Sequence, residues 1–540
     1  MTQSLPLLGC PRRPAQGYIS LLLHAHLPFV RHPEHEKFLE ESWLFEAILE
    51  SYIPLLQLLE RWEQENLDVR LTLTLSPTLC SMLSDPLLQQ RHRRRMDELV
   101  ELAEKEIQRT QSDATCHQLA QMYRSRFAAI RDYYLRCEAD LVGAFRDLQE
   151  RGRVEIMTCA ATHALLPLLA HHAPSMRAQI LVARDHYQSC FGCEPRGIWL
   201  PECAYTERLE PMLREANLRW FITDTHGILH ARPRPRCGVF APVLTPSGLA
   251  AFGRDKDSAW QVWSRDEGYP ADPRYRDFYR DIGFDLDCDY LGPCLPAPGQ
   301  RGFTGLKYYR ITNRSAQKEF YARPEALQAA LEHAEQFLQQ RQIQIEKLSR
   351  IMDQPPILLC PYDAELFGHW WYEGPEFLDG LVRRVCASPG PIAFITPEQY
   401  LGRHLQLQVA SPSASSWGEE GYWRVWLNDT NEWIYPHLNV AQQRMTETAE
   451  SFACPDPLQR RALNQAARDL LLAQASDWPF ILSAGTNADY ARNRLNTHLA
   501  RFTNLYEQLS AKQIDPRQLE LLESQDNIFP QLDYTYFRSR

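Results

Sequence analysis

Two acidic residues of this chain each follow an apolar run that contains a proline. Glu202 lies in the segment GIWLPECAY at 197–205, and Asp363 lies in CPYDAELFGHWW at 360–371. Proline has no N–H to donate to a strand ladder, so each carboxylate is expected just beyond the end of a buried strand. Ligands meet parallel α/β sheets at the carboxyl ends of their strands. The two acids could therefore share one pocket, and the alternative for either acid alone is to cap the next helix.

Paired carboxyl groups suggest cleavage of a glycosidic bond. That reaction needs one ionised carboxylate that attacks C1 of the sugar and one carboxylic acid that protonates the leaving oxygen. The surroundings must then push the two pKa values apart. We take Glu202 as the candidate nucleophile. Several strand–helix units lie between it and Asp363, enough to bring the two acids into one pocket.

Three histidines also end predicted strands. His24 and His26 lie two apart at the end of the segment 17–29, and residues two apart on a strand point to the same side. His163 follows the predicted strand 153–159 in the same way. The functional interpretation is a set of imidazoles that line a pocket. The alternatives are surface histidines in loops or, for the pair at 24 and 26, half of a metal site.

Tryptophan is abundant, with 13 in the chain, and four of them cluster at Trp417, Trp423, Trp426 and Trp433. An indole face stacks on the apolar C–H side of a sugar ring, so a carbohydrate cleft collects such residues. For any single tryptophan, packing in the core is the more common role. The density of the four, next to glycine and charged residues, favours a binding surface.

Composition narrows the class of protein. The 540 residues are 44% hydrophobic and 23% charged, which suffices for a large core or for two to three domains. The chain contains no apolar run of about 18 residues, so we expect no membrane span. The net charge of −10 argues against nucleic acid as a partner, because phosphate binding needs a basic face.

The 14 cysteines are scattered along the chain. Cys159, Cys203 and Cys360 lie inside apolar runs, where a reduced cysteine acts as a small hydrophobe, so we expect a reduced, cytoplasmic protein. Cys190 and Cys193 form one C-x-x-C, but no second pair completes a zinc spacing. The first ten residues lack the basic start and the apolar length of a leader, and we expect a disordered cytoplasmic N-terminus.

The order of elements indicates a parallel sheet with two helical additions. A strand, a helix and a strand at 17–29, 43–62 and 70–75 form a β-α-β unit. Further strands are predicted at 153–159, 197–200, 220–223, 239–243, 357–360 and 392–395. Residues 85–152 show only helical patterns, and 411–416 (SPSASS) looks like a linker. We therefore expect a catalytic barrel from 1–84 and 153–410, a helical insertion at 85–152 and a helical C-terminal domain at 411–540.

Several motifs together resemble those of glycoside hydrolase family 57. They are HAHLPFV at 24–30, the segment around His163, IWLPECAY at 198–205, CPYDAELFGHWW at 360–371, WGE at 417–419 and SDWPF at 476–480. Their order and spacing cover nearly the whole chain. Within the family the chain is most similar to the members that branch α-1,4-glucans. The resemblance implies an α/β fold, an incomplete (β/α)7 barrel with a helical insertion and a helical C-terminal domain.

The resemblance also implies a reaction and a site. The reaction is a retaining double displacement, with Glu202 as nucleophile and Asp363 as general acid/base, that moves a cut α-1,4-glucan chain to a 6-hydroxyl. It implies no metal and no organic cofactor, α-1,4-glucan such as glycogen or amylose as partner, no membrane, and a monomer or homodimer. The substrate-binding residues that it implies are His24, His26, His163, Arg254, Trp263, Trp417, Trp426, Asp477 and Trp478.

One feature departs from the family pattern. Branching members are expected to carry a tyrosine on a mobile loop over the site, and this sequence has none between 221 and 268, where we take 232–240 (RPRPRCGVF) as the loop. An α-amylase-like retaining hydrolase is therefore the alternative. Two other classes remain open: a metal-dependent, deacetylase-like enzyme that uses His24 and His26, and a non-catalytic module that binds glucan.

Overall fold

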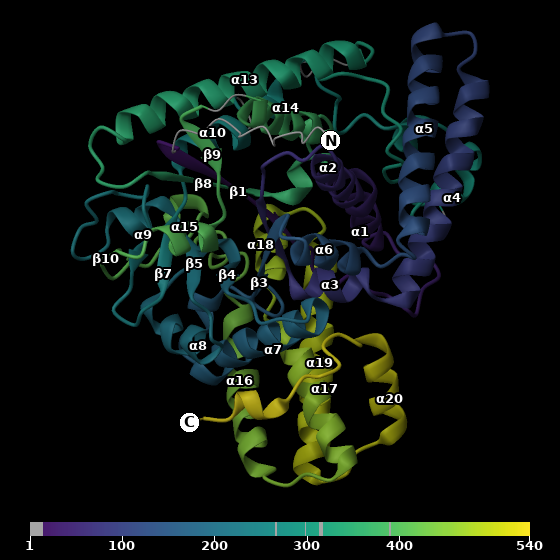
Figure 1. Ribbon diagram of the computed structural model, residues 1–540. Helices are drawn as coiled ribbons and strands as arrows, with labels where there is room; N and C mark the ends of the chain where they lie inside the picture. The colour runs from purple at the N-terminus through teal and green to yellow at the C-terminus, as the bar shows by residue number, and fades with distance from the viewer. Residues whose placement is uncertain (1–14, 265–266, 298, 313–316, 388–389, 540) are drawn as a thin grey trace, which may run out of the picture.

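A ten-stranded sheet forms the centre of the molecule (Figure 1). The structure is a computed structural model that describes residues 15–539 except 265–266, 298, 313–316 and 388–389, so the expectation for the first ten residues lies outside it. The strand order is β10-β6-β7-β5-β4-β3-β2-β1-β8, and β9 pairs with the start of β1. The strands are β1 (Gly17–Ala25), β2 (Leu71–Leu75), β3 (Val154–Cys159), β4 (Gly197–Trp199), β5 (Trp220–Thr223), β6 (Val243–Leu244), β7 (Ala250–Gly253), β8 (Ile357–Asp363), β9 (Ile392–Phe394) and β10 (Gln408–Val409).

Seven of the strands in the described ranges, β7-β5-β4-β3-β2-β1-β8, are neighbours and run parallel. Parallel neighbours need long crossover connections, and helices supply them here. The sheet curls so that the N–H of Asp255, just after β7, donates to the carbonyl of Leu359 in β8 at 2.8 Å. The prediction of an α/β fold with an incomplete seven-stranded barrel is therefore confirmed.

The barrel interior is filled by alternate side chains of these strands. Leu22, Met157, Trp199 and Trp220 belong to one buried cluster inside the curled sheet, while the residues between them pack outward against helices. The two-residue period of the strands therefore decides which side chains can reach the site at the strand ends.

Helices cover the outside of the sheet and build the two additions. They are α1 (Glu41–Ala47), α2 (Ile53–Gln64), α3 (Pro77–Leu83), α4 (Pro86–Arg109), α5 (Ala114–Arg136), α6 (Leu141–Glu150), α7 (Ala173–Phe191), α8 (Glu210–Glu215), α9 (Thr225–Leu229), α10 (Lys256–Trp263), α11 (Ile282–Asp285), α12 (Cys288–Leu291), α13 (Arg323–Leu348), α14 (Gly374–Ala387), α15 (Pro397–Arg403), α16 (Ile434–Ser451), α17 (Pro457–Ala473), α18 (Asp477–Ala484), α19 (Ala488–Ala511) and α20 (Pro516–Gln525).

The segment between β2 and β3 consists of helices, as the sequence predicts. Asp85 and Asp113 begin α4 and α5 by accepting hydrogen bonds from backbone N–H groups of the first turn. The two long helices pack against each other and form an upright pair at the edge of the molecule (Figure 1). The chain after the barrel is helical too, with α17 packed on α19 at the bottom of the view in Figure 1.

Two predictions about local structure are wrong. Residues 411–416 are not a linker, because Ser411 pairs with Arg232, Ser415 pairs with Tyr205, and both Ser415 and Ser416 are fully buried. The predicted strand at 239–243 is only the two-residue β6, since the prolines that flank it cannot donate to a ladder. The serine-rich composition of 411–416 correctly indicates a loop, but it does not indicate that the loop is buried.

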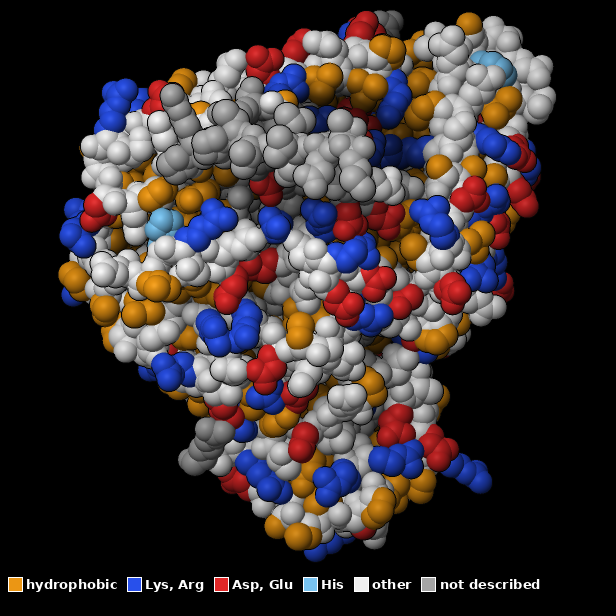
Figure 2. Space-filling model, viewed as in Figure 1, with side chains coloured by type: hydrophobic (Ala, Val, Ile, Leu, Met, Phe, Trp, Pro, Cys, Tyr) orange, Lys and Arg blue, Asp and Glu red, His pale blue; other side chains and the backbone are white. Residues whose placement is uncertain are grey.

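The surface seen in Figure 2 carries acidic and basic side chains interspersed over the same face. Among the helices of the described residues, none is long and apolar enough to cross a membrane.

Candidate active site

The two acids of the sequence analysis meet at one end of the barrel. In the β1–β8 pair, His24 stands level with Asp363, the last residue of β8. In the β3–β4 pair, Cys159 stands level with Trp199, and Glu202 follows three residues later. Because the strands are parallel, their carboxyl ends lie at the same edge of the sheet.

A cavity of about 520 Å³ opens at this edge. Its size suits a small-molecule or oligosaccharide ligand. Nine of the predicted site residues line it, namely His24, His26, His163, Glu202, Arg254, Trp263, Asp363, Trp417 and Asp477. Four lining residues escaped the sequence analysis, namely Leu27, Glu365, Trp370 and Phe480.

Glu202 occupies a strained position that points its carboxylate into the cavity. Its φ of 63° lies in the left-handed region, which is unfavourable for a residue with a Cβ and is common at active sites. The carbonyl of Glu202 accepts from the N–H of Trp417 at 2.9 Å, and the indole N–H of Trp417 donates to the Glu202 carboxylate. Trp417, more than 200 positions away in the sequence, therefore holds both the backbone and the carboxylate of Glu202.

The pKa of Glu202 is raised to about 7: burial raises it most, the hydrogen bond from Trp417 lowers it, and the neighbouring Asp477 carboxylate raises it. Burial also raises the pKa of Asp363 well above its usual range, and the negative charges of Glu365 and Glu202 act in the same direction. Arg254 opposes this effect. The N–H donor of Trp417 thus favours the ionised form of Glu202 against the effect of burial, and the two acidic neighbours of Asp363 favour its protonated form.

Glu365 is a second acid of the motif that contains Asp363. It accepts from the hydroxyl of Tyr52 and from the backbone N–H of His26 at 3.2 Å, so it ties the end of β1 to the end of β8. The two-residue spacing of Asp363 and Glu365 was the signal that could have identified it.

The three histidines form a stack beside the acids. The rings of His26 and His163 lie 3.8 Å apart, and Nε2 of His24 lies 3.0 Å from Nε2 of His163. Burial lowers the pKa of His24 and of His163 well below its usual range, and the neighbouring His26 adds to the effect for both. Both imidazoles are therefore neutral and serve as hydrogen-bond partners.

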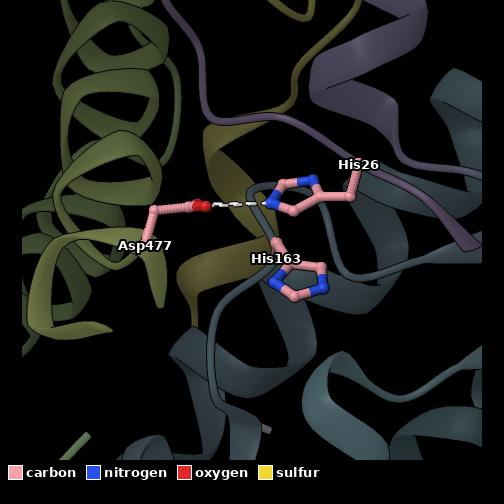
Figure 3. A group of neighbouring side chains, drawn as sticks. All are labelled: His26, His163 and Asp477. Atoms are coloured by element: carbon pink, nitrogen blue, oxygen red, sulfur yellow. Dashed lines mark hydrogen bonds and ion pairs between the residues drawn. The ribbon is translucent and has the colours of Figure 1, made fainter. Parts of the chain in front are cut away.

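Asp477 enters the site from the C-terminal helices. It is the first residue of α18 and lies 3.2 Å from Nε2 of His26 (Figure 3). The residue before it, Ser476, contacts Nδ1 of His163 through its hydroxyl at 2.9 Å. The C-terminal region therefore completes the wall of the cavity.

His26, His163 and Asp477 also offer ligand atoms within 4.8 Å of one another, the spacing of a metal site. The nitrogens concerned already have protein partners. Both nitrogens of His163 contact protein groups, Nε2 of His24 and the hydroxyl of Ser476, so an ion bound to His163 would have to displace one of these contacts. In the structure these side chains form a hydrogen-bond network.

Arg254 supplies the cationic part of the cavity. It pairs with Asp224 at 2.6 Å, and its guanidinium lies 5.6 Å from the ring centre of Trp417. Two further indoles of the lining, Trp263 and Trp370, have ring centres 6.0 Å apart, and Trp370 is exposed. Flat apolar faces together with charged groups are the pattern of a sugar-binding cleft.

Two predicted binding residues need correction. Trp426 is 1% exposed and packs on Leu165 and Ala204, and Trp478 is fully buried and donates its indole N–H to the carbonyl of Leu472 at 2.8 Å. Neither indole lines the cavity. The core-packing role, which is the usual one for a single tryptophan, applies to both.

The segment 232–240 runs beside β7 and the start of β8. The carbonyl of Phe240 accepts from the N–H of Ile357, the first residue of β8, and Val239 packs next to Gly253 at the carboxyl end of β7. None of residues 232–240 lines the cavity, so its assignment as the loop over the site stays a prediction.

Comparisons with known proteins agree with the geometry. Residues 20–411 match the family model described as glycosyl hydrolase family 57, and residues 437–537 match the one described as 1,4-alpha-glucan branching enzyme, C-terminal. The 1,4-alpha-glucan branching enzyme TK1436 of Thermococcus kodakarensis is 31% identical over 95% of this chain and 77% of its own.

Two solved structures match over almost the whole chain. The alpha-amylase AmyC from Thermotoga maritima superposes with a TM-score of 0.91 at 42% identity, covering 96% of this chain and 99% of that chain. The GH57-type branching enzyme from Pyrococcus horikoshii superposes with a TM-score of 0.87 at 30% identity, covering 97% of each chain.

Proposed function

The chain belongs to glycosyl hydrolase family 57, and we propose that it acts as a 1,4-alpha-glucan branching enzyme. It cuts an α-1,4 bond of a glucan, holds the cut piece covalently and transfers it to a 6-hydroxyl, which makes an α-1,6 branch. The observation that carries transfer over plain cleavage is the match of residues 437–537 to the C-terminal model of branching enzymes.

In the first step the Glu202 carboxylate attacks C1 of the sugar at the cleavage point. The bond from C1 to the glycosidic oxygen breaks as the new ester bond forms, and the proton of Asp363 goes to the leaving oxygen. The raised pKa of Asp363 supports this role, because the acid has to hold its proton at neutral pH.

In the second step the Asp363 carboxylate accepts the proton of the incoming 6-hydroxyl. The hydroxyl oxygen attacks C1, the ester bond to Glu202 breaks, and Asp363 is again protonated. Two displacements at C1 leave its configuration unchanged. His24, His26 and His163 hold the sugar at the cleavage point, and Asp477 orients His26.

A specific observation also favours plain hydrolysis. The relative from Thermotoga maritima is described as an alpha-amylase, and the stretch 221–268 contains no tyrosine. In that reaction water takes the place of the 6-hydroxyl in the second step, and the same two carboxyl groups serve.

Incubation with amylose separates the two functions. We expect proton NMR to show new α-1,6 signals with few new reducing ends, and reducing ends without branch signals would establish hydrolysis instead. The Glu202→Gln variant should produce neither signal, because its amide cannot form the ester. Full activity in the Glu202→Gln variant would contradict the assignment of Glu202 as the nucleophile.

We extend the proposal to the setting of the enzyme. It works in the cytoplasm on glycogen or amylose as a monomer or homodimer, and the unpaired, buried thiols of Cys159, Cys203 and Cys360 suit a reducing compartment. The interspersed charges in Figure 2 suit a neutral polysaccharide better than a nucleic acid. The chain divides into a barrel from 1–84 and 153–410, the insertion at 85–152 and the C-terminal domain at 411–540.

A further inference from the structure

The C-x-x-C of the sequence, Cys190 and Cys193, does not act as a pair in the fold. Helix α7 ends at Phe191, and Gly192 takes the left-handed conformation (φ 70°) that turns the chain away from the helix axis. Cys193 is exposed, and its sulfur lies 3.4 Å from the Gln149 side-chain nitrogen, on α6. The two thiols of the motif therefore face different neighbours.

Cys190 instead faces α3 together with a histidine of its own helix. His186 precedes it by four residues, so both side chains lie on one face of α7. Nε2 of His186 lies 3.6 Å from the sulfur of Cys190 and 3.2 Å from the hydroxyl of Ser81 on α3. The histidine thus bridges the two helices at the position of the cysteine.

Cys80 is the neighbour of Ser81 on α3, and its thiol lies against that of Cys190. The hydrogen-bonding interaction between the two thiols is the largest influence on the pKa of each, and it lowers the pKa of Cys190 and raises that of Cys80. Hydrogen bonding to His186 and the charge of Arg146 also lower the pKa of Cys190. A thiol in such surroundings is more nucleophilic at neutral pH than an ordinary cysteine.

The two thiols differ in access. Cys190 is half-buried next to a surface pocket that His186 and Ser189 line, whereas Cys80 is buried at 1% exposure. Of the two thiols, Cys190 is therefore the more accessible to a small reagent from solution.

We propose that Cys190 and Cys80 form a thiol-modification site, in which a low-molecular-weight disulfide such as glutathione disulfide converts the pair to a reversible cross-link between α7 and α3. The catalytic proposal does not depend on this thiol site, and neither cysteine lines the active-site cavity.

The exchange proceeds in two balanced steps. The Cys190 thiolate attacks one sulfur of the small disulfide, a mixed disulfide forms on Cys190, and one small thiolate leaves. The Cys80 thiol then gives its proton to Nε2 of His186 or to water, its thiolate attacks the Cys190 sulfur, and the second small thiolate leaves. The two protein thiols are oxidised by two electrons, and the small disulfide is reduced to two thiols.

The cross-link reaches the active site through one helix. Ser76 caps α3, and its hydroxyl lies 2.9 Å from Nδ1 of His26. Thr78, in the first turn of the same helix, also contacts that nitrogen at 3.4 Å. A bond at Cys80 therefore fixes the helix that orients a histidine of the sugar pocket.

The test treats the folded full-length protein with glutathione disulfide, blocks the remaining thiols by alkylation, and maps disulfides by mass spectrometry without reduction. We expect a cross-linked peptide pair that contains Cys80 and Cys190 and that dithiothreitol removes. The Cys193→Ser variant should give the same cross-link. The Cys80→Ser variant should trap glutathione on Cys190, because the second thiol is missing.

Three results would overturn the proposal. They are a bond between Cys190 and Cys193, a Cys190 that stays unmodified while the exposed Cys193 and Cys454 react, and a cross-link that forms only in denaturant. The mapping on the unsubstituted protein decides the matter even where a variant fails to fold.

Discussion

The indole of Trp417 should set the lower pH limit of the reaction. Glu202 must be ionised to attack C1, and burial brings its pKa to about 7 although the Trp417 N–H lowers it. Activity should therefore fall as the pH drops through about 7. The Trp417→Phe variant keeps an aromatic face for the sugar but removes the N–H donor, so the pKa of Glu202 rises and the acid limb of the pH profile moves to higher pH.

The size of the shift follows from the hydrogen bond. A hydrogen bond to a charged group stabilises by roughly 1.5–3 kcal/mol, and about 1.4 kcal/mol corresponds to one pKa unit. The Glu202 side chain is 17% exposed, so water can replace part of the lost donation. We therefore expect the lower end of this range, a displacement of about one pH unit.

The assay is the pH dependence of kcat/KM on amylose. The matched control is Trp263→Phe, which also alters an indole of the cavity but does not contact Glu202. The control should lower kcat/KM without a change of the acid limb. An unshifted limb in Trp417→Phe, or an equal shift in both variants, would refute the assignment of Trp417 as the donor that keeps Glu202 ionised.

Two further predictions concern the buried Trp426 and the possible metal ligands. Trp426→Ala should lower the melting temperature, because removal of a fully buried tryptophan costs about 3–5 kcal/mol. Trp263→Ala should instead raise KM for glucan more than Trp426→Ala does and lower the melting temperature less. A large KM effect of Trp426→Ala at unchanged stability would restore Trp426 to the binding site. Dialysis against EDTA should leave activity intact, because both nitrogens of His163 already contact protein groups. Activity lost to EDTA and regained with zinc would support the metal-dependent class.

The sequence predicts the strands and their ends well, because those signals are local. An apolar run followed by a polar residue suffices to place Glu202, Asp363 and His163 near strand ends, and the structure puts all three around one cavity. The prediction that Pro361 ends its strand is wrong, because β8 continues through it to Asp363. The two-residue spacing of His24 and His26 likewise predicts their shared face.

The contacts that tune these groups are not local and could not be predicted in the same way. Nothing around Trp417 indicates that its indole meets Glu202, and nothing in the serines of 411–416 indicates that they are buried against the barrel. Trp426 and Trp478 share their sequence surroundings with binding tryptophans. Only the packing of Leu165 on Trp426 and the hydrogen bond from Trp478 to the carbonyl of Leu472 distinguish core from surface.

The acid pair depends on strand register as much as on residue type. His24 stands level with Asp363 on one side of β1 and with Thr74 on the other, so these positions form the last inward-facing layer of the barrel. A slip of β1 by one residue would turn His24 outward and bring Leu23 or Ala25, according to its direction, to the level of Asp363. The buried residues one layer below, among them Leu22, fix that register through their packing. Substitutions in that layer should therefore impair catalysis without touching the substrate, since they disturb the level at which the carboxyl groups meet.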